Sequence, residues 1–292
     1  MLEIWTVLMP LLRWMFYPAM LLAVGGVGFA LLMRPWILAD IDHYMRRVTC
    51  RAGLAAMCFA LAQLPVAAGA LGGDLASAVD LVLLQLVIDS PTGLSALVAA
   101  AGLLLLLVIE RVPTAVPPLI RMVPPVIIII SMTLVGHATS RGVLTGMLLS
   151  LHLAGIGFWL AALLPLRRLC LAPMNDEAMA RLASLAEEFG RMAVVMVAML
   201  VVAGICFAAL LLGSVGALFT SGYGQLLLAK MALVSGMLLL AAINRFRLVP
   251  ALRDKAAVAV QGLRRSIEME MGIAGLILLA TAILTTSLPL PM

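Results

Sequence analysis

Charged residues are scarce in this chain. They make up 11% of its 292 residues, whereas 64% are apolar and the mean hydropathy is +1.19. Soluble domains carry roughly 25% charged residues, so this chain has too little polar surface to cover a water-facing exterior. The composition excludes a soluble globular protein and predicts an integral membrane protein. The net charge of +5 needs no nucleic acid, because basic residues collect in the cytoplasmic loops of membrane proteins.

The motifs of soluble catalytic sites are also missing. The sequence contains no Walker loop, GxGxxG, HExxH or GxSxG pattern, which leaves ATP-driven pumping and hydrolysis without support. The four cysteines, Cys50, Cys58, Cys170 and Cys206, form no CxxC pair, and the interpretation as small apolar fillers suits Cys50 and Cys170. We therefore expect no enzyme, but a transporter, a channel, an electron carrier or an assembly factor.

The apolar residues are grouped in eight stretches, each about 18–24 residues long and thus able to cross a hydrocarbon core as a helix. The approximate cores of these spans are 12–33, 50–71, 93–110, 122–140, 143–166, 190–213, 224–245 and 269–290. The predicted fold is an all-α, polytopic membrane helix bundle that forms a single integral membrane domain over residues 1–292. Three connectors, "PWILADIDHYMRR", "MNDEAMARLASLAEEF" and the outer stretch "LASAVDLVLLQLVI", which is too short to span, are predicted to be helices lying on the membrane surface.

Lysine and arginine predict the orientation. Sixteen of the 19 basic residues lie in loops one, three, five and seven or at their edges, whereas the alternate loops hold only Arg141. Basic loops stay in the cytoplasm. We therefore expect a multi-pass protein of the bacterial inner membrane with both termini in the periplasm.

Two of the three histidines lie in one apolar hairpin. His137 is near the outer end of the fourth span and His152 is in the outer half of the fifth. A polar group inside a membrane is costly unless it is used, and two imidazoles on adjacent helices can share a metal or pass it on. Trp159 lies two turns after His152 on the same helix face. Gly155 and Gly157 allow a neighbouring helix to approach closely.

The sixth span carries a stripe of sulfur ligands. Met192, Met196, Met199 and Cys206 lie on one helical face that runs from the inner end to the outer half. Thioether and thiolate groups suit Cu(I), so Met196, Met199 and Cys206 are candidate ligands. The alternative is ordinary packing, because methionine is a common gap-filler and the chain has 20 of them.

Further polar residues lie within or beside the last two spans. Lys230 is in the outer third of the seventh span. It either has a functional role or extends its ammonium group to the membrane surface. Asn244 and Arg245 end that span. Glu268 and Glu270 are predicted at the cytoplasmic mouth of the eighth, either as acids that stabilise a helix N-terminus or as a site for copper exit or proton coupling.

The second half of the chain resembles the copper resistance D (CopD) family of bacterial inner-membrane proteins. The resemblance covers about residues 122–290 well and the first three spans weakly, and it rests on the order and spacing of marks across five spans. These marks are "GHA" at 136–138, "HLAGIGFW" at 152–159, Phe189, Gly204, Tyr223-Gly224, Leu227, Lys230, Asn244-Arg245, Pro250, Arg264-Arg265, Ser266 and Glu270.

The resemblance implies copper movement across the inner membrane, commonly toward the cytoplasm, with a small periplasmic copper-binding protein (CopC-like) as partner. Copper, as Cu(I) or Cu(II), would then meet His137 and His152 first. Two alternatives stay open at this point. Facing histidines also hold b-type haem in membrane cytochromes, and an assembly factor could hand copper to a cuproenzyme without transporting it.

Overall fold

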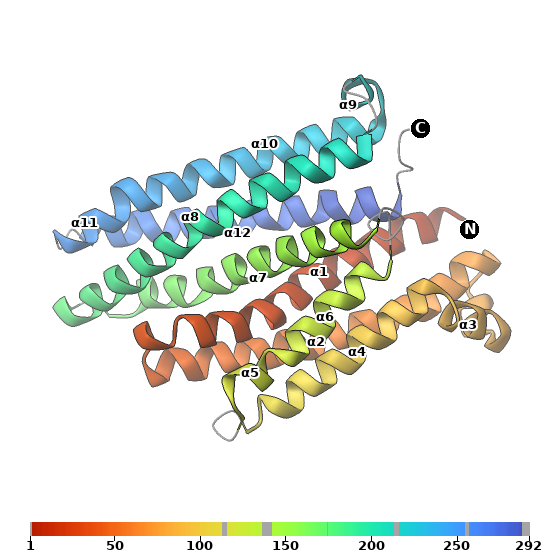
Figure 1. Cartoon of the computed structure of the whole chain (residues 1–292), viewed down its shortest axis with the longest axis horizontal. Helices are drawn as coiled ribbons and strands as arrows, with labels where there is room; N and C mark the ends of the chain where they lie inside the picture. The colour runs from red at the N-terminus through yellow and green to blue at the C-terminus, as the bar shows by residue number, and fades with distance from the viewer. Residues whose placement is uncertain are drawn as a thin grey trace.

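A computed structural model describes residues 2–112, 116–135, 142–173, 175–212, 216–254 and 257–287. Over these residues the chain forms helices and turns and no strand, which confirms the predicted all-α class. Seven helices are long and apolar enough to cross a membrane, and they run along roughly the same direction (Figure 1). The chain is a polytopic helix bundle.

The long helices account for seven of the eight predicted spans. They are α1 (Leu2–Leu32), α2 (Ala39–Gly72), α4 (Pro91–Ile109), α7 (Val143–Leu171), α8 (Asp176–Leu212), α10 (Gly222–Ile243) and α12 (Ala257–Thr286). The predicted fourth span, 122–140, is represented by a shorter apolar segment, α5 (Pro118–Arg121) with α6 (Val123–Thr133). Residues 136–140 of that span lie outside the described residues.

Short elements connect these helices. They are α3 (Leu81–Ile88), α9 (Ala217–Thr220), α11 (Val249–Arg253), 3₁₀ turns at Arg34–Trp36 and Ala76–Val79, and a π-helical turn at Asn244–Leu248. Side-chain caps fix several helix starts: Asp80 accepts from the Val82 and Leu83 N–H groups before α3, and Ser221 accepts from the Gly224 N–H before α10. α2 is capped at its C-terminus by Gly73, whose φ of +83° favours glycine.

The prediction of separate surface helices is wrong for "PWILADIDHYMRR" and "MNDEAMARLASLAEEF", which lead directly into long helices, whereas "LASAVDLVLLQLVI" does contain a separate short helix, α3. α2, α8 and α12 begin at Ala39, Asp176 and Ala257, and the polar connectors are their first turns. The reason is tertiary packing: these turns bury an apolar face, as Leu182 and Leu185 do with exposures of 0% and 1%. Hydropathy marks the part of a helix that crosses lipid, but not an amphipathic extension that packs against protein.

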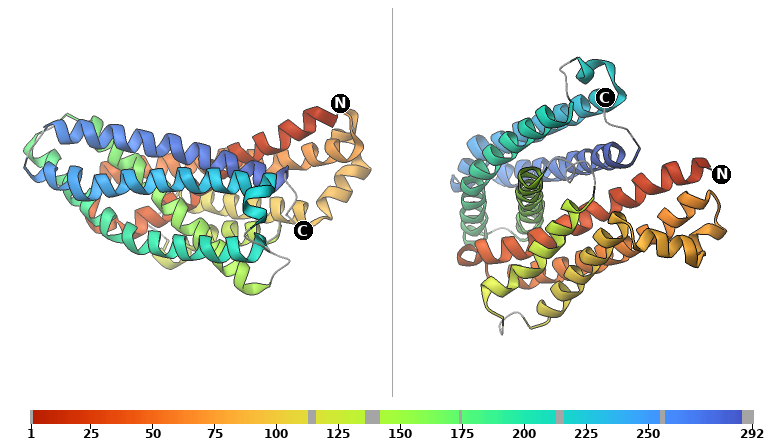
Figure 2. Two further views of the ribbon diagram at one scale, coloured as in Figure 1. Left: turned by 90° about the horizontal axis from the view of Figure 1, so that it is seen from above. Right: turned by 45° about the vertical axis from the view of Figure 1, so that its right-hand side comes forward.

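Helix α7 lies in the middle of the bundle, with α1, α2, α4 and α6 on one side and α8, α10 and α12 on the other (Figures 1 and 2). Its glycines permit this position. A Cβ atom on Gly25 of α1 would lie 1.9 Å from the Gly157 carbonyl oxygen, and one on Gly155 would lie 3.3 Å from Leu200 of α8. The predicted close approach at both glycines is confirmed.

The two ends of the bundle differ in charge. One end, here called the basic end, holds the connections from α1 to α2, from α4 to α5, from α7 to α8 and from α10 to α12, and therefore the arginine-rich loops. The opposite end holds α3, α9, the start of α1 and the last described residues of α12 (Figure 1). Both terminal helices thus reach the same end, which agrees with termini on one side; which side this is stays a prediction.

Candidate functional site

Three of the predicted residues meet around one buried carboxylate. Glu270, on α12, is only 1% exposed. The Trp159 indole N–H, from α7, donates to Glu270 Oε2 at 3.3 Å. The Asn244 side-chain amide, at the start of the π-helical turn, donates to Glu270 Oε1 at 2.5 Å. We call Trp159, Asn244 and Glu270 the carboxylate cluster.

Aromatic rings pack between the carboxylate cluster and helix α8. Trp159 is 4% exposed, and its ring meets Phe189 of α8 edge to face with the centroids 5.7 Å apart. Phe158 also lies against Phe189, with the centroids 6.1 Å apart. Edge-to-face contacts of this kind stabilise beyond the area they bury. The indole ring is therefore held so that its N–H stays directed at Glu270.

Two buried oxygen atoms near the cluster lack hydrogen-bond partners among the described residues. They are Asn244 Oδ1 and Ser266 Oγ. Ser266 is 3% exposed and lies one turn before Glu270 on α12, so the two share a helix face. Buried polar atoms are nearly always paired. The region therefore has hydrogen-bonding capacity left over, beside a π-helical turn of the kind that is frequent at functional sites.

Glu268, two residues away, is in a different environment. It is paired with Arg167 of α7 at 2.9 Å and lies 3.6 Å from Arg264, and its side chain is 36% exposed. The prediction placed both acids at the mouth of the last span. Because α12 begins at Ala257, Glu270 lies more than three turns into the helix, and its position at the mouth of the span stays a prediction. Glu270 precedes Thr286 by about 24 Å of helix, which places it within the bundle.

A second layer of polar residues lies nearer the opposite end. His152 lies on α7 and Lys230 on α10, the helix that packs against α12. His152 precedes Trp159 by seven residues, about 10 Å of helix. His152 is therefore nearer the opposite end than the carboxylate cluster. His137 lies outside the described residues, so its predicted pairing with His152 stays a prediction.

The other predicted residues lie along α8 and the π-helical turn. Met196 is partly buried against the core, whereas Met199 is 36% exposed and Cys206 is half-buried. Arg245 reaches α8, where a Cβ atom on Gly190 would lie 3.2 Å from its Nη1. Among the described residues, no group of three or more His, Cys, Asp or Glu side chains is placed to hold a metal ion.

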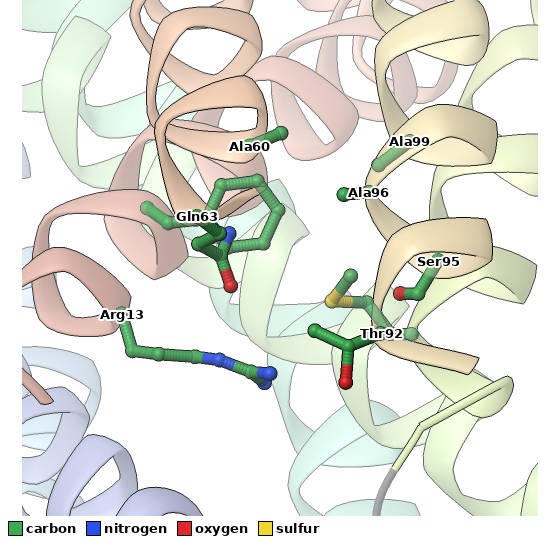
Figure 3. A pocket seen from close by; sticks show the side chains of 9 residues that line it. Arg13, Ala60, Gln63, Thr92, Ser95, Ala96 and Ala99 are labelled. Carbon is green, nitrogen blue, oxygen red and sulfur yellow. The ribbon is translucent and has the colours of Figure 1, made fainter. Parts of the chain in front are cut away.

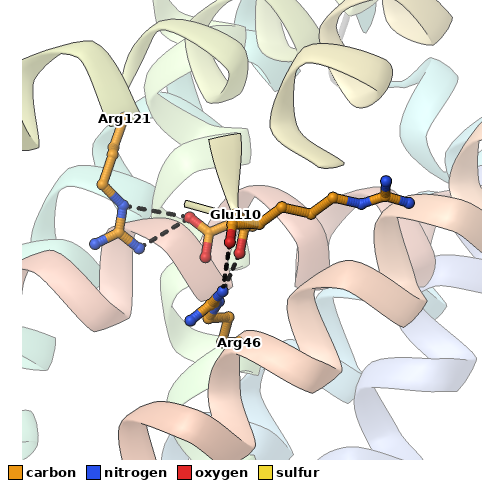
Figure 4. Close-up of polar contacts among 4 residues, drawn as sticks. Arg46, Glu110 and Arg121 are labelled. Carbon is orange, nitrogen blue, oxygen red and sulfur yellow. Dashed lines mark hydrogen bonds and ion pairs between the residues drawn. The ribbon is translucent and has the colours of Figure 1, made fainter. Parts of the chain in front are cut away.

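The N-terminal half contains a second buried carboxylate that the sequence analysis missed. Glu110, 3% exposed, forms an ion pair with Arg121 at 2.8 Å, and Arg46 of α2 donates to its backbone carbonyl and to that of Arg111 (Figure 4). Glu110 ends α4 beside Arg111, at the edge of a loop, where a carboxylate is usually solvated. Only the packing of α2 against α4 reveals that it is buried.

A shallow cavity lies toward the opposite end of the same half. Arg13 of α1 and Gln63 of α2 point into it, with Thr92 and Ser95 of α4 on its far wall (Figure 3). Arg13 Nη1 is 3.4 Å from the Tyr17 hydroxyl, and the Ser95 hydroxyl donates to the Ser131 carbonyl. The cavity lies in the half that lacks the carboxylate cluster, so it is a separate feature.

Comparison with known families gives two matches along the chain. The model described as Copper resistance protein D matches residues 183–284, and the model of the Copper resistance protein D-like N-terminal domain matches residues 1–147. The second match corrects the prediction that the first three spans resemble this family only weakly. Those spans are predicted from hydropathy alone, because they contain few polar residues on which a resemblance could rest.

A curated relative agrees with the family models. The Copper resistance protein D of Pseudomonas syringae pv. tomato is 36% identical over 148 residues, which is 48% of this chain and 47% of that protein. The match thus spans about half the length of this relative. Comparison with solved structures finds no match.

Proposed function

We propose that this chain, which belongs to the copper resistance protein D family, carries copper through its helix bundle. Family membership and seven apolar helices make it a multi-pass protein of the bacterial inner membrane with a role in copper resistance and homeostasis. Transport, its direction and its route are our inferences. We infer import toward the basic end, which the distribution of arginine predicts to be cytoplasmic.

One observation supports the route most directly. α7 carries His152 and, two turns further on, Trp159, whose indole N–H meets the Glu270 carboxylate of α12. Intramembrane polar residues that face a bundle interior mark ion pathways. Two such layers along one helix, about 10 Å apart, suit a cation that steps from the opposite end toward the basic end.

We assign the entrance to His137 and His152. Imidazole binds copper in either oxidation state, whereas Met196, Met199 and Cys206 on α8 favour the reduced ion. A periplasmic copper-binding protein of the CopC-like kind would deliver the metal at this end. Because imidazole ligates only in its neutral form, copper binding should weaken as the pH falls through the range in which the histidines take up a proton.

Copper uptake into proteoliposomes tests the proposal. His152→Gln and His137→Gln should each lower uptake at least tenfold, because each removes one ligand of a small set. His43→Gln is the matched control: it removes the third histidine, which is exposed on α2, and should transport like the wild type.

Two outcomes would overturn the proposal. A Soret band in the purified protein that either substitution abolishes would assign the histidines to b-type haem. Copper that binds and passes to a soluble acceptor, with no flux into the vesicles, would indicate an assembly factor.

A further inference from the structure

Among the described residues, Glu270 has no basic partner for its charge. Both groups that donate to it, the Trp159 indole and the Asn244 amide, are neutral. Within the part of the chain that the structure describes, Glu270 forms no ion pair with Lys, Arg or His. A buried carboxylate without a cation is costly, more so inside a membrane. It therefore needs a proton or a passing cation to neutralise it.

The ionisable groups on the neighbouring helices are directed elsewhere. Arg167 of α7 pairs with Glu268, and Arg253 of α11 pairs with Glu187 of α8. Arg13 of α1 contacts Tyr17. The other described ionisable residues on α12 and on the elements packed against it are His152, Arg168, Cys170, Tyr223, Lys230, Arg245, Arg247, Arg264 and Arg265, and none of them forms an ion pair with Glu270.

The hydrogen bonds around Glu270 can serve both charge states. As a carboxylate, Glu270 accepts from Trp159 and Asn244 at its two oxygens. As an acid it needs an acceptor for its own O–H. The Asn244 Oδ1 atom is buried and makes no hydrogen bond to a described residue, so a rotation of the Asn244 amide turns it from donor into acceptor. Ser266 Oγ, one turn away, adds a second polar atom with capacity to spare.

We propose that Glu270 binds one proton and one copper(I) ion alternately, so that copper movement releases a proton from the carboxylate cluster. This rests on the proposed copper transport and adds its coupling. Charge balances in the step: the neutral acid loses its proton to the aqueous phase, and the carboxylate then balances the single charge of the passing ion. No redox change is involved. Carboxylate is a weak ligand for a soft ion, so copper(I) would occupy the site only briefly.

A copper-free experiment tests the proton site by itself. The wild type in liposomes should give an infrared band of a protonated carboxyl that disappears as the pH is raised from about 5 to 9, the range of documented buried carboxyls. Glu270→Gln should remove this band. Glu177→Gln, which removes an exposed carboxylate on α8, should retain it. A wild type without the band, or a Glu270→Gln variant that keeps it, would overturn the proton site.

A second experiment tests the coupling. Copper(I) added to proteoliposomes that contain a pH-sensitive dye should move protons in the direction opposite to copper, in the wild type and in Glu177→Gln. Glu270→Gln should lose at least nine-tenths of this proton signal, and its copper flux should no longer respond to a pH gradient. Trp159→Phe removes one donor and keeps the ring, so it should shift the pH midpoint of the infrared band.

The two experiments separate the two proposals. A titrating Glu270 band with no copper flux in any variant would contradict copper transport while the proton site stands. Copper flux that drives equal proton movement in the wild type and in Glu270→Gln would contradict the coupling while transport stands.

Discussion

Glu110 and Glu270 are both almost fully buried, with exposures of 3% and 1%, but their partners differ. Glu110, in the N-terminal half, is held by Arg121, and Arg46 binds the backbone beside it. Glu270, in the C-terminal half, is held by an indole and an amide. A positive partner keeps a carboxylate charged, whereas neutral donors leave it free to bind a proton or another cation.

This difference between the two carboxylates suggests that the N-terminal and C-terminal halves of the chain have different roles. The ion pair of Glu110 joins α4 to α5 and, through Arg46, to α2, so it fixes the helices at the basic end. The carboxylate cluster joins α7, the π-helical turn and α12 without a positive charge. We infer that the first half is the rigid support and the second contains the route for ions. The predictions below test this comparison.

The largest effect is expected at Arg121. Arg121→Leu leaves a buried carboxylate without its cation, which typically destabilises by about 3–5 kcal/mol. The midpoint of thermal unfolding in detergent should fall markedly. Arg181→Leu is the control, because Arg181 pairs with Glu177 on the surface of α8 with exposures of 41% and 77%, and such a pair contributes at most about 1 kcal/mol. Equal losses in the two variants would contradict the fixed ion pair.

The next effect concerns the contact that joins the halves. In Gly25→Ala the new Cβ atom would lie 1.9 Å from the backbone oxygen of Gly157, so α1 and α7 have to separate. Overpacking of this kind costs about 1–3 kcal/mol. Gly28→Ala, on the same helix with no atom within 4 Å of its new Cβ, should instead stabilise by about 0.5–1 kcal/mol. Thermal unfolding of the two variants should therefore shift in opposite directions.

Much of the fold could be predicted from hydropathy, because a helix that crosses lipid has to be long and apolar. Seven predicted spans match long helices, and the face of Leu182 and Leu185 is buried as its spacing indicates. The starts of α2, α8 and α12 could not be predicted in this way. Their first turns are polar on one side, and only packing against other helices decides that they continue the same helix.

The site could be predicted in part. Asn244 and Glu270 are recognisable as polar residues in an apolar setting, and Trp159 by its place on the helix face of His152, but 111 residues separate Trp159 from Glu270. Helical spacing gives the face of a residue and not the helix that it meets, so the cluster itself did not follow from the sequence. Glu110 was missed for the same reason. The pairing of His137 with His152 stays a prediction.

A smaller contrast should separate the two buried acids themselves. Glu110→Gln leaves Arg121 without a charged partner and should destabilise by about 1–3 kcal/mol. Glu270→Gln keeps the shape, accepts from Trp159 through its carbonyl and can donate to Asn244 Oδ1, so unfolding should shift by less than about 1 kcal/mol. Thermal unfolding near neutral pH measures both. A Glu270→Gln variant as unstable as Glu110→Gln would mean that the charge of Glu270 stabilises the fold.

The smallest effect is expected at Glu268, which shares α12 with Glu270 but lies at the solvent-exposed edge. Its ion pair with Arg167 has exposures of 36% and 40%, and Arg264 is a second partner at 3.6 Å. Arg167→Gln should therefore destabilise by less than about 1 kcal/mol. Because salt screens exposed charges over about 3 Å at 1 M, the difference from the wild type should vanish in high salt, whereas the loss in Arg121→Leu should persist. A salt-resistant loss in Arg167→Gln would mean that this pair is shielded from solvent, so that the second half also contains a fixed, buried ion pair.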